Sequence, residues 1–150
     1  MAFPLPEPMR RALTLAAGGA RAGEVPIGAV LMRGGEVVAE AANATRFGND
    51  PTAHAEMLVI RRGAERLGQE RLGDCDLWVT LEPCAMCAGA IAHARIRRLY
   101  YAAPDPKGGG VEHGARVFDQ PTCHHRPEIY AGLGEAAAAA LLRNFFRMRR

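Results

Sequence analysis

The sequence predicts a mixed α/β fold in which helices cover the faces of one β-sheet. Short apolar runs of strand length alternate with segments of helical periodicity, and glycines and prolines separate them. The chain has 150 residues, 49% of them hydrophobic, and we find no internal repeat and no long linker. We therefore expect a single domain over residues 1–150.

The first half of the chain predicts a helix, a β-hairpin and a second helix. Leucines and alanines recur at helical spacing before Gly23, and two apolar runs flank the turn-forming pair Gly34-Gly35. A polar segment rich in turn formers then leads to Thr52, near the start of the next helix. The expected elements are a helix over Met9–Arg21, strands over Ile27–Met32 and Glu36–Ala41, a loop over Asn43–Thr52 and a helix over His54–Arg62.

The second half predicts three more strands, so that the sheet has five. Pro83 favours a helix start directly after a strand-like run, and Gly134 separates the last strand from an alanine-rich helix. The expected elements are strands over Leu77–Leu81, Arg98–Ala102 and Glu128–Leu133, helices over Cys84–Ala94 and Glu135–Arg150, and a Gly/Pro-rich loop over Pro104–Gly110. A hairpin joins antiparallel strands, and a helical connection typically joins parallel ones. Because the chain is expected to contain both kinds of connection, we expect a mixed sheet.

Composition and charge argue against several classes of protein. No apolar run approaches the roughly 20 residues that a bilayer span needs, so we expect no membrane partner. Residues Met1–Pro8 lack the charged-then-apolar pattern of a secretion signal, which disfavours a secreted protein. The formal net charge of +3 is too small to require a nucleic-acid partner by itself.

The central motif combines His54-Ala55-Glu56 with Pro83-Cys84-Ala85-Met86-Cys87, each at an expected helix start. Zn²⁺ prefers four tetrahedral ligands, and C-x-x-C in the first turn of a helix places two sulfurs at one end, where the helix dipole stabilises thiolates. His54 would supply a third ligand. The other cysteines and histidines show no ligand spacing for a fourth; they are Cys75, His93, His113, Cys123, His124 and His125. Three protein ligands and an open position are typical of catalytic zinc.

Glu56 lies two residues after His54, and positions i and i+2 do not share a helix face. Glu56 therefore need not bind the metal, and it can accept a proton from a water molecule activated by zinc and pass that proton on. The alternative is a first-turn acid that the helix dipole favours, but the cysteines nearby favour a catalytic role. The combination H-x-E…P-C-x-x-C is the signature of zinc-dependent deaminases.

Longer stretches around this motif carry a family resemblance. They are Glu24–Val30, Asp50–Glu56, Val79–Ala90 and Phe145–Arg150. Over nearly its whole length the chain resembles the bacterial tRNA-specific adenosine deaminases of the cytidine deaminase superfamily. The zinc motif is common to that superfamily, whereas the run from Thr80 to Ala90 and the terminal Phe-Phe-Arg-Met-Arg-Arg point to the tRNA branch.

The resemblance implies a three-layer, cytidine-deaminase-like fold and a cytoplasmic homodimer with one Zn²⁺ per subunit. It implies hydrolysis of the wobble adenosine in a tRNA anticodon stem-loop to inosine, with release of ammonia and with RNA contacts from both subunits. Carried over position by position, His54, Cys84 and Cys87 bind the zinc, and Glu56 shuttles the proton.

Two further residues are expected at the substrate. Asn43 matches a base-contacting asparagine, whose amide offers a donor and an acceptor to an adenine edge. Asp105 matches an aspartate near the RNA ribose, where it could accept from a 2′-OH. The alternative for both is a role in turn geometry alone.

Most of the expected RNA contacts lie in the C-terminal helix, because arginine binds phosphate and aromatic rings stack on unpaired bases. They are Phe145, Phe146, Arg147, Arg149 and Arg150, and Lys107 and His124 are expected contacts outside this helix. The alternative is an amphipathic helix with an arginine face in solvent and a core face formed by Leu141, Leu142, Phe145 and Met148. Both interpretations of the helix can hold together, and we expect at least one phenylalanine in the core.

Two features depart from the family pattern: His124 replaces an asparagine, and Gly108–Gly110 suggest looser RNA contacts.

Two other functions compete with tRNA deamination. A free-base deaminase acting on guanine or cytosine would share the zinc motif, but it does not need the arginine-rich and aromatic C-terminus. A non-catalytic zinc- and RNA-binding accessory subunit would bind metal without releasing ammonia.

Overall fold

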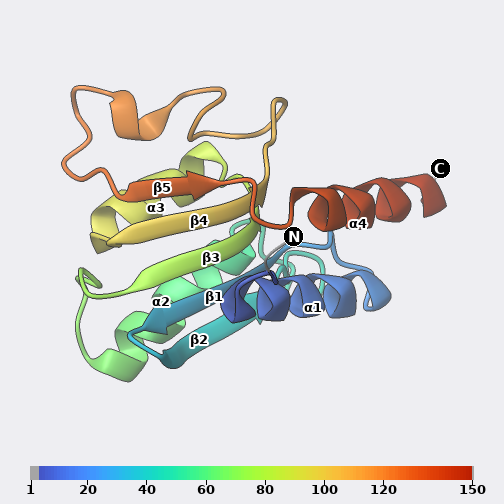
Figure 1. Ribbon diagram of the computed structural model, residues 1–150, viewed down its shortest axis with the longest axis horizontal. Helices are drawn as coiled ribbons and strands as arrows, with labels where there is room; N and C mark the ends of the chain where they lie inside the picture. Colours follow the sequence, from blue (N-terminus) through green and yellow to red (C-terminus); the bar gives the residue numbers. More distant parts are fainter. Residues whose placement is uncertain (1–3, 150) are drawn as a thin grey trace.

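The computed structural model describes residues 4–149 and contains a five-stranded sheet between two layers of helices (Figure 1). The strands lie in the order β2-β1-β3-β4-β5; β1 is antiparallel to β2 and β3, whereas β3, β4 and β5 are parallel. The mixed α/β fold predicted from the sequence is confirmed. The elements are α1 (Glu7–Arg21), β1 (Gly28–Arg33), β2 (Glu36–Ala42), α2 (Ala55–Leu67), β3 (Asp76–Leu81), α3 (Ala85–Ala94), β4 (Arg98–Ala103), η1 (Val117–Asp119), β5 (Glu128–Ala131) and α4 (Glu135–Met148).

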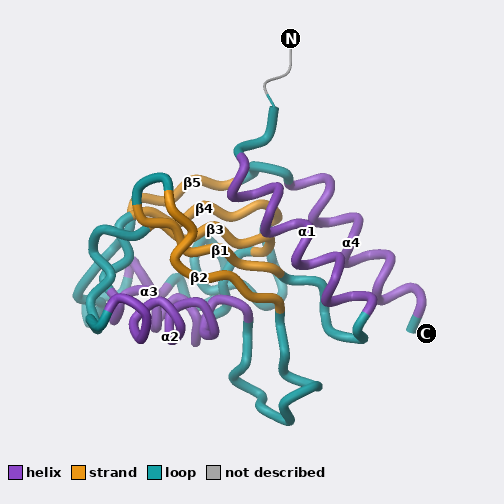
Figure 2. The backbone as a smooth tube through the Cα atoms, turned by 90° about the horizontal axis from the view of Figure 1, so that it is seen from below, coloured by secondary structure: helices purple, strands orange, loops and turns teal. Residues whose placement is uncertain are grey.

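The helices form one layer on each face of the sheet. Helices α2 and α3 cover one face, and α1 and α4 cover the other (Figure 2). Because successive side chains of a strand point to opposite faces, Leu77 and Val79 of β3 pack under α2 and α3, whereas Trp78 packs on the other side. Among residues 4–149, no helix combines the length and the apolar character that a membrane crossing requires.

Two glycines allow helices to approach the sheet closely. A Cβ at Gly28 in β1 would clash with the backbone carbonyl of Ala12 in α1. Gly63 lies where α2 crosses Leu31, and the helix continues through it to Leu67. The expected end of this helix at Arg62 is therefore wrong. The glycine that follows Arg62 allows close packing against the sheet and does not end the helix. The helix ends instead at Gly68, whose φ of 65° is left-handed.

The other differences from the expected elements are local. The short helix η1 was not expected, and it lies in the long connection between β4 and β5. Strand β5 ends at Ala131, before the expected Leu133, because Gly132 takes a φ of 92°. Helix α4 begins directly after the left-handed Gly134, as its composition predicts.

Candidate metal centre and substrate cleft

His54 and Cys84 occupy equivalent positions, since each directly precedes the first turn of a helix and has an extended backbone. Cys87 follows within the first turn of α3. The Nδ1 atom of His54 lies 3.6 Å from Cys84 Sγ and 3.4 Å from Cys87 Sγ. All three candidate ligand atoms lie within 4.8 Å of one another. The structure thus brings together the three side chains that the motif predicts as metal ligands.

The donor chemistry of this cluster fits a zinc ion. Hydrogen bonding with Cys87 and with His54 outweighs burial and lowers the pKa of the Cys84 thiol to about 4. The start of α3 adds its dipole, which favours a thiolate further. Two sulfurs and one imidazole nitrogen facing one point match the three-ligand sets of catalytic zinc sites.

Glu56 lies beside the cluster in the first turn of α2 and is only 3% exposed. Its carboxylate interacts with Cys87, and among residues 4–149 the Oε1 atom has no hydrogen-bond partner. Burial raises the pKa of Glu56 to about 7. A buried carboxylate oxygen without a partner is costly, so it is a candidate to contact a bound water molecule or a substrate.

Asn43 follows β2 and is buried next to the same helix start. Its Oδ1 accepts a hydrogen bond of 2.8 Å from the backbone N–H of Ala55, the first residue of α2. Asn43 therefore satisfies an N-terminal amide of α2 from outside the helix, because His54 makes no side-chain cap. This bond fixes the orientation of the amide group beside His54.

A cleft of about 580 Å³ opens at His54. The segments after β2 and after β4 and two residues of α4 contribute to its walls. The lining residues are Val25, Ile27, Asn43, Thr45, His54, Leu81, Pro104, Asp105, Lys107, Gly108, Leu142 and Phe146. The structure therefore brings both expected substrate-binding residues, Asn43 and Asp105, to one cleft with an expected metal ligand.

The cleft continues into a basic groove along α4. This groove has a volume of about 780 Å³ and is lined by Lys107, Leu142, Arg143, Phe146, Arg147 and Arg149. Lys107, Leu142 and Phe146 line both spaces. Four of the expected RNA contacts, Lys107, Phe146, Arg147 and Arg149, thus lie on a surface continuous with the cleft.

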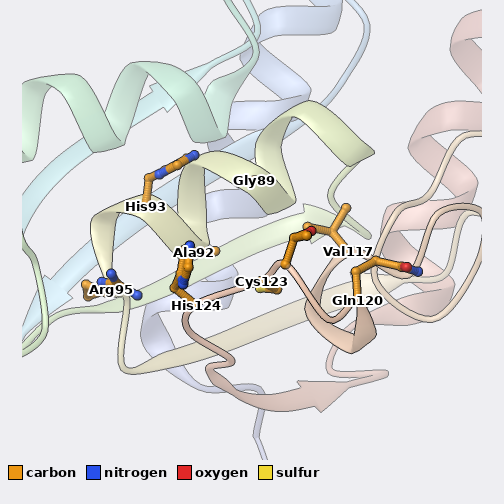
Figure 3. A pocket seen from close by; sticks show the side chains of 9 residues that line it. Gly89, Ala92, His93, Arg95, Val117, Gln120, Cys123 and His124 are labelled. Carbon is orange, nitrogen blue, oxygen red and sulfur yellow. The ribbon is translucent and has the colours of Figure 1, made fainter.

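Other expected RNA contacts do not reach the cleft. Phe145 is buried, as expected for at least one phenylalanine, and the Arg149 guanidinium lies 4.4 Å from its ring centre. Met148 is 84% exposed, so its expected place in the core of an amphipathic helix is wrong. His124 borders a separate cavity of about 180 Å³ beside α3 (Figure 3). Arg150 lies outside the described residues.

Sequence reasoning missed Glu24, which supports the loop that follows Asn43. This carboxylate is 4% exposed and accepts backbone N–H groups from Arg46 at 3.1 Å and Phe47 at 2.7 Å. One feature of the sequence indicated its importance, because Glu24 begins Glu24–Val30, one of the stretches that carry the family resemblance. Glu24 belongs to no motif with the spacing of metal ligands or catalytic residues.

Asp105 also has the turn role that the alternative interpretation assigned to it. Its Oδ1 accepts the backbone N–H groups of Lys107 at 3.2 Å and Gly108 at 3.0 Å. These hydrogen bonds support the glycine-rich loop, and the looser RNA contacts expected at Gly108–Gly110 stay a prediction. Both roles are compatible, because a carboxylate offers about four acceptor positions.

Comparison with known proteins identifies the family. The profile of the MafB19-like deaminases matches residues 6–150. The chain is 60% identical to the tRNA-specific adenosine deaminase of Agrobacterium fabrum, over 95% of this chain and 93% of that one. It is 42% identical to the tRNA-specific adenosine deaminase of Rickettsia bellii, over 93% of this chain and 97% of that one.

Solved structures agree with this. A structure from a study of A-to-I editing by tRNA deaminases at the wobble position superposes with a TM-score of 0.89 and 59% identity, covering 90% of this chain and 98% of that one. The guanine deaminase of Bacillus subtilis is less similar, with a TM-score of 0.66 and 36% identity over 95% of this chain and 91% of that one. The chain therefore belongs to the MafB19-like deaminases and, among them, to the family of tRNA-specific adenosine deaminases.

Proposed function

We propose that this protein hydrolyses the wobble adenosine of a tRNA anticodon stem-loop to inosine and releases ammonia. The observation that carries this proposal is the continuity of three features. The His54–Cys84–Cys87 cluster, the cleft at His54 and the basic groove of α4 adjoin one another. A free base would fill part of the cleft, whereas the groove beyond it suits a phosphate backbone.

Within this proposal, His54, Cys84 and Cys87 hold one zinc ion in each subunit. When bound, zinc acts as a Lewis acid that activates water for attack on the adenine ring. Glu56 accepts a proton from the attacking water and returns it to the leaving amine, which departs as ammonia. Its burial beside the metal ligands, and its Oε1 atom without a hydrogen-bond partner among the described residues, support this role.

The walls of the cleft hold the nucleoside. Asn43 presents its amide group to the adenine edge, and Asp105 accepts a hydrogen bond from a ribose 2′-OH. Phe146 is 51% exposed and lines the cleft, so it can stack on a neighbouring base. Lys107, Arg147 and Arg149 line the groove, where they bind phosphate, and Arg150 extends this basic set in the sequence.

We propose that the active form is a homodimer. Helix α3 contains no Asp, Glu, Lys or Arg, and its Met86 is 37% exposed. A helix without a charged face is typically buried, and a second copy of the chain would cover this one. His124 borders a cavity beside α3 and does not line the cleft (Figure 3), so in this proposal its contact with RNA depends on the dimer. Because tRNAs are used in the cytoplasm, we place the enzyme there.

The deciding experiment compares substrates. We expect inosine and ammonia from an RNA anticodon stem-loop with adenosine at the wobble position, and no product from free guanine, cytosine or adenine. Turnover of a free base alone would establish the free-base alternative. Tight stem-loop binding by zinc-loaded protein without ammonia release would establish the accessory-subunit alternative.

A further inference from the structure

Glu82 is the last polar residue before the metal-binding motif, and its side chain is fully buried. It directly follows β3, and its backbone N–H donates to the carbonyl of Ala103 at the end of β4. Its carboxylate therefore lies under the segment that leaves β4. A buried carboxylate persists only where hydrogen bonds compensate for its lost hydration.

Five hydrogen bonds provide this compensation, and all of them come from one loop. Oε1 accepts the backbone N–H of Asp105 at 2.9 Å and contacts the ring Nδ1 of His113 at 2.7 Å. Oε2 accepts the backbone N–H groups of Val111, Glu112 and His113 at 3.2, 3.0 and 3.1 Å. One side chain thus holds both ends of the segment Asp105–His113.

This segment contains no helix or strand and depends on such contacts for its shape. Gly109 packs against the carboxylate so closely that a Cβ there would clash with Glu82 and with the carbonyl of Asp105. A carboxylate offers about four acceptor positions and makes strong hydrogen bonds to N–H groups, so Glu82 suits this cluster of donors.

The loop places three of its residues, Asp105, Lys107 and Gly108, in the substrate cleft. The backbone N–H of Asp105 binds Glu82, and the Asp105 side chain closes the turn to Lys107 and Gly108. From this chain of contacts we infer that Glu82 is a positioning residue, which sets the place of Asp105 and thereby the recognition of the substrate ribose. The inference rests on the proposed tRNA deaminase function and deepens it.

A double-mutant cycle tests whether Glu82 acts through Asp105. The variants are Glu82→Gln, Asp105→Ala and their combination, with Glu36→Gln on the exposed start of β2 as the matched control. Each is assayed per bound zinc, on an RNA stem-loop and on the same stem-loop with 2′-deoxy nucleotides in the loop. A residue that works through another gives non-additive effects in such a cycle.

We expect Glu82→Gln to raise KM for the RNA stem-loop about tenfold, which is the scale of one lost hydrogen bond to a charged group. The value of kcat should change less than about twofold, since Glu56 and the metal ligands are untouched. The preference for RNA over the deoxy substrate should fall in Glu82→Gln and in Asp105→Ala alike. The combined variant should be no worse than Asp105→Ala alone.

Gly109→Ala is the second variant, because it displaces the loop from Glu82 and leaves the carboxylate in place. Gly35→Ala, in the open turn between β1 and β2, is its control. We expect Gly109→Ala to raise KM and reduce the ribose preference as Glu82→Gln does, and Gly35→Ala to do neither.

The outcomes separate this inference from the function on which it rests. A wild-type protein that does not deaminate the stem-loop overturns the proposed function. With an active wild type, additive effects of Glu82→Gln and Asp105→Ala overturn the positioning role. An equal loss of kcat on both substrates in Glu82→Gln would also overturn it, and so would a loss of bound zinc in that variant. In either case Glu82 would support the metal centre or the fold in general.

Discussion

At the scale of single residues, the candidate site uses polar atoms that folding removes from water. Glu56 has a buried oxygen without a partner among the described residues, and Asn43 uses its own oxygen to satisfy the start of α2. The two situations are opposite, since Asn43 has a contact that holds it and Glu56 has an oxygen left for a ligand.

Replacing Glu56 tests the proton transfer. We expect Glu56→Ala to retain zinc, because the three ligand atoms come from other residues, and to lose roughly 10²–10⁴-fold in kcat, the usual contribution of a general acid–base group. Metal analysis of the purified variant and inosine formation on the stem-loop measure the two quantities. Retained turnover would refute the shuttle role of Glu56.

Asn43 is expected to serve both the fold and the substrate. In Asn43→Ala the buried N–H of Ala55 loses its partner, which should lower the free energy of unfolding by about 1–3 kcal/mol. Asn43→Asp restores the acceptor and most of this stability, but it removes the amide donor, so kcat/KM should stay low. Thermal unfolding and steady-state kinetics separate the two effects; full activity of Asn43→Asp would mean that Asn43 is only a cap.

At the scale of elements, α4 divides its aromatic residues between the core and the cleft. Phe145 is 8% exposed and Phe146 is 51% exposed, and their rings pack edge to face at 5.4 Å. Consecutive helical residues point about 100° apart, so one ring can face the sheet while the next faces the cleft. The helix thus covers the sheet (Figure 2) and also forms part of the wall of the cleft.

The two phenylalanines form a matched pair for mutation. We expect Phe145→Ala to lower stability by roughly 3 kcal/mol, the usual cost of removing a buried ring. Phe146→Ala should leave stability within about 0.5 kcal/mol and weaken binding of the stem-loop by about tenfold, a typical loss of base stacking. Denaturant unfolding and binding titration check both. Equal losses of stability in the two variants would contradict this division.

The basic groove on α4 predicts binding that depends on salt. Each phosphate contact to a single-stranded segment contributes about 0.7 to the slope of log affinity against log salt. We expect Arg147→Ala to reduce this slope by about that amount for the stem-loop. Arg71→Ala, on an exposed loop outside the groove, should leave the slope unchanged. An unchanged slope in Arg147→Ala would remove this residue from the RNA path.

At the scale of the whole molecule, α3 joins the candidate metal centre to the proposed dimer. It contributes Cys87 at its start, and it presents a surface without Asp, Glu, Lys or Arg along its length. Covering this helix would exclude water from the neighbourhood of the metal site, which strengthens electrostatic interactions there. Assembly and activity should therefore be linked.

A charge on this surface should separate the subunits. Ala90 lies one helical turn after Met86 and is partly exposed, so we expect Ala90→Arg to give a folded monomer that has lost most stem-loop turnover. Sedimentation at several concentrations measures the assembly, and circular dichroism verifies the fold. A wild-type protein that sediments as a monomer would contradict the proposed dimer.

The sequence predicted most of the fold, and its errors have local causes. The expected end of α2 at Arg62 directly precedes Gly63, a glycine that contact with Leu31 requires and through which the helix continues. The place assigned to Met148 came from helical periodicity, which cannot show that α4 extends beyond the elements it covers (Figure 1). For Gly63 a contact with a residue distant in sequence decided the structure, and for Met148 the lack of such a contact among the described residues did. Neither can be predicted from a local sequence pattern.

The sequence alone determined that Cys84 and Cys87 lie together, because the C-x-x-C spacing fixes two sulfurs within one helix turn. The motif also predicted His54 as the third ligand, but its approach to the two sulfurs depends on how α2 packs beside α3. The substrate cleft was decided only by tertiary structure. Asn43, Asp105 and Phe146 come from three segments that the sheet order brings to one end. The same holds for Glu82, whose five contacts lie 23 to 31 residues away along the chain. Local spacing encodes what one helix turn can align, whereas the positions of separate loops follow from how the strands and helices pack.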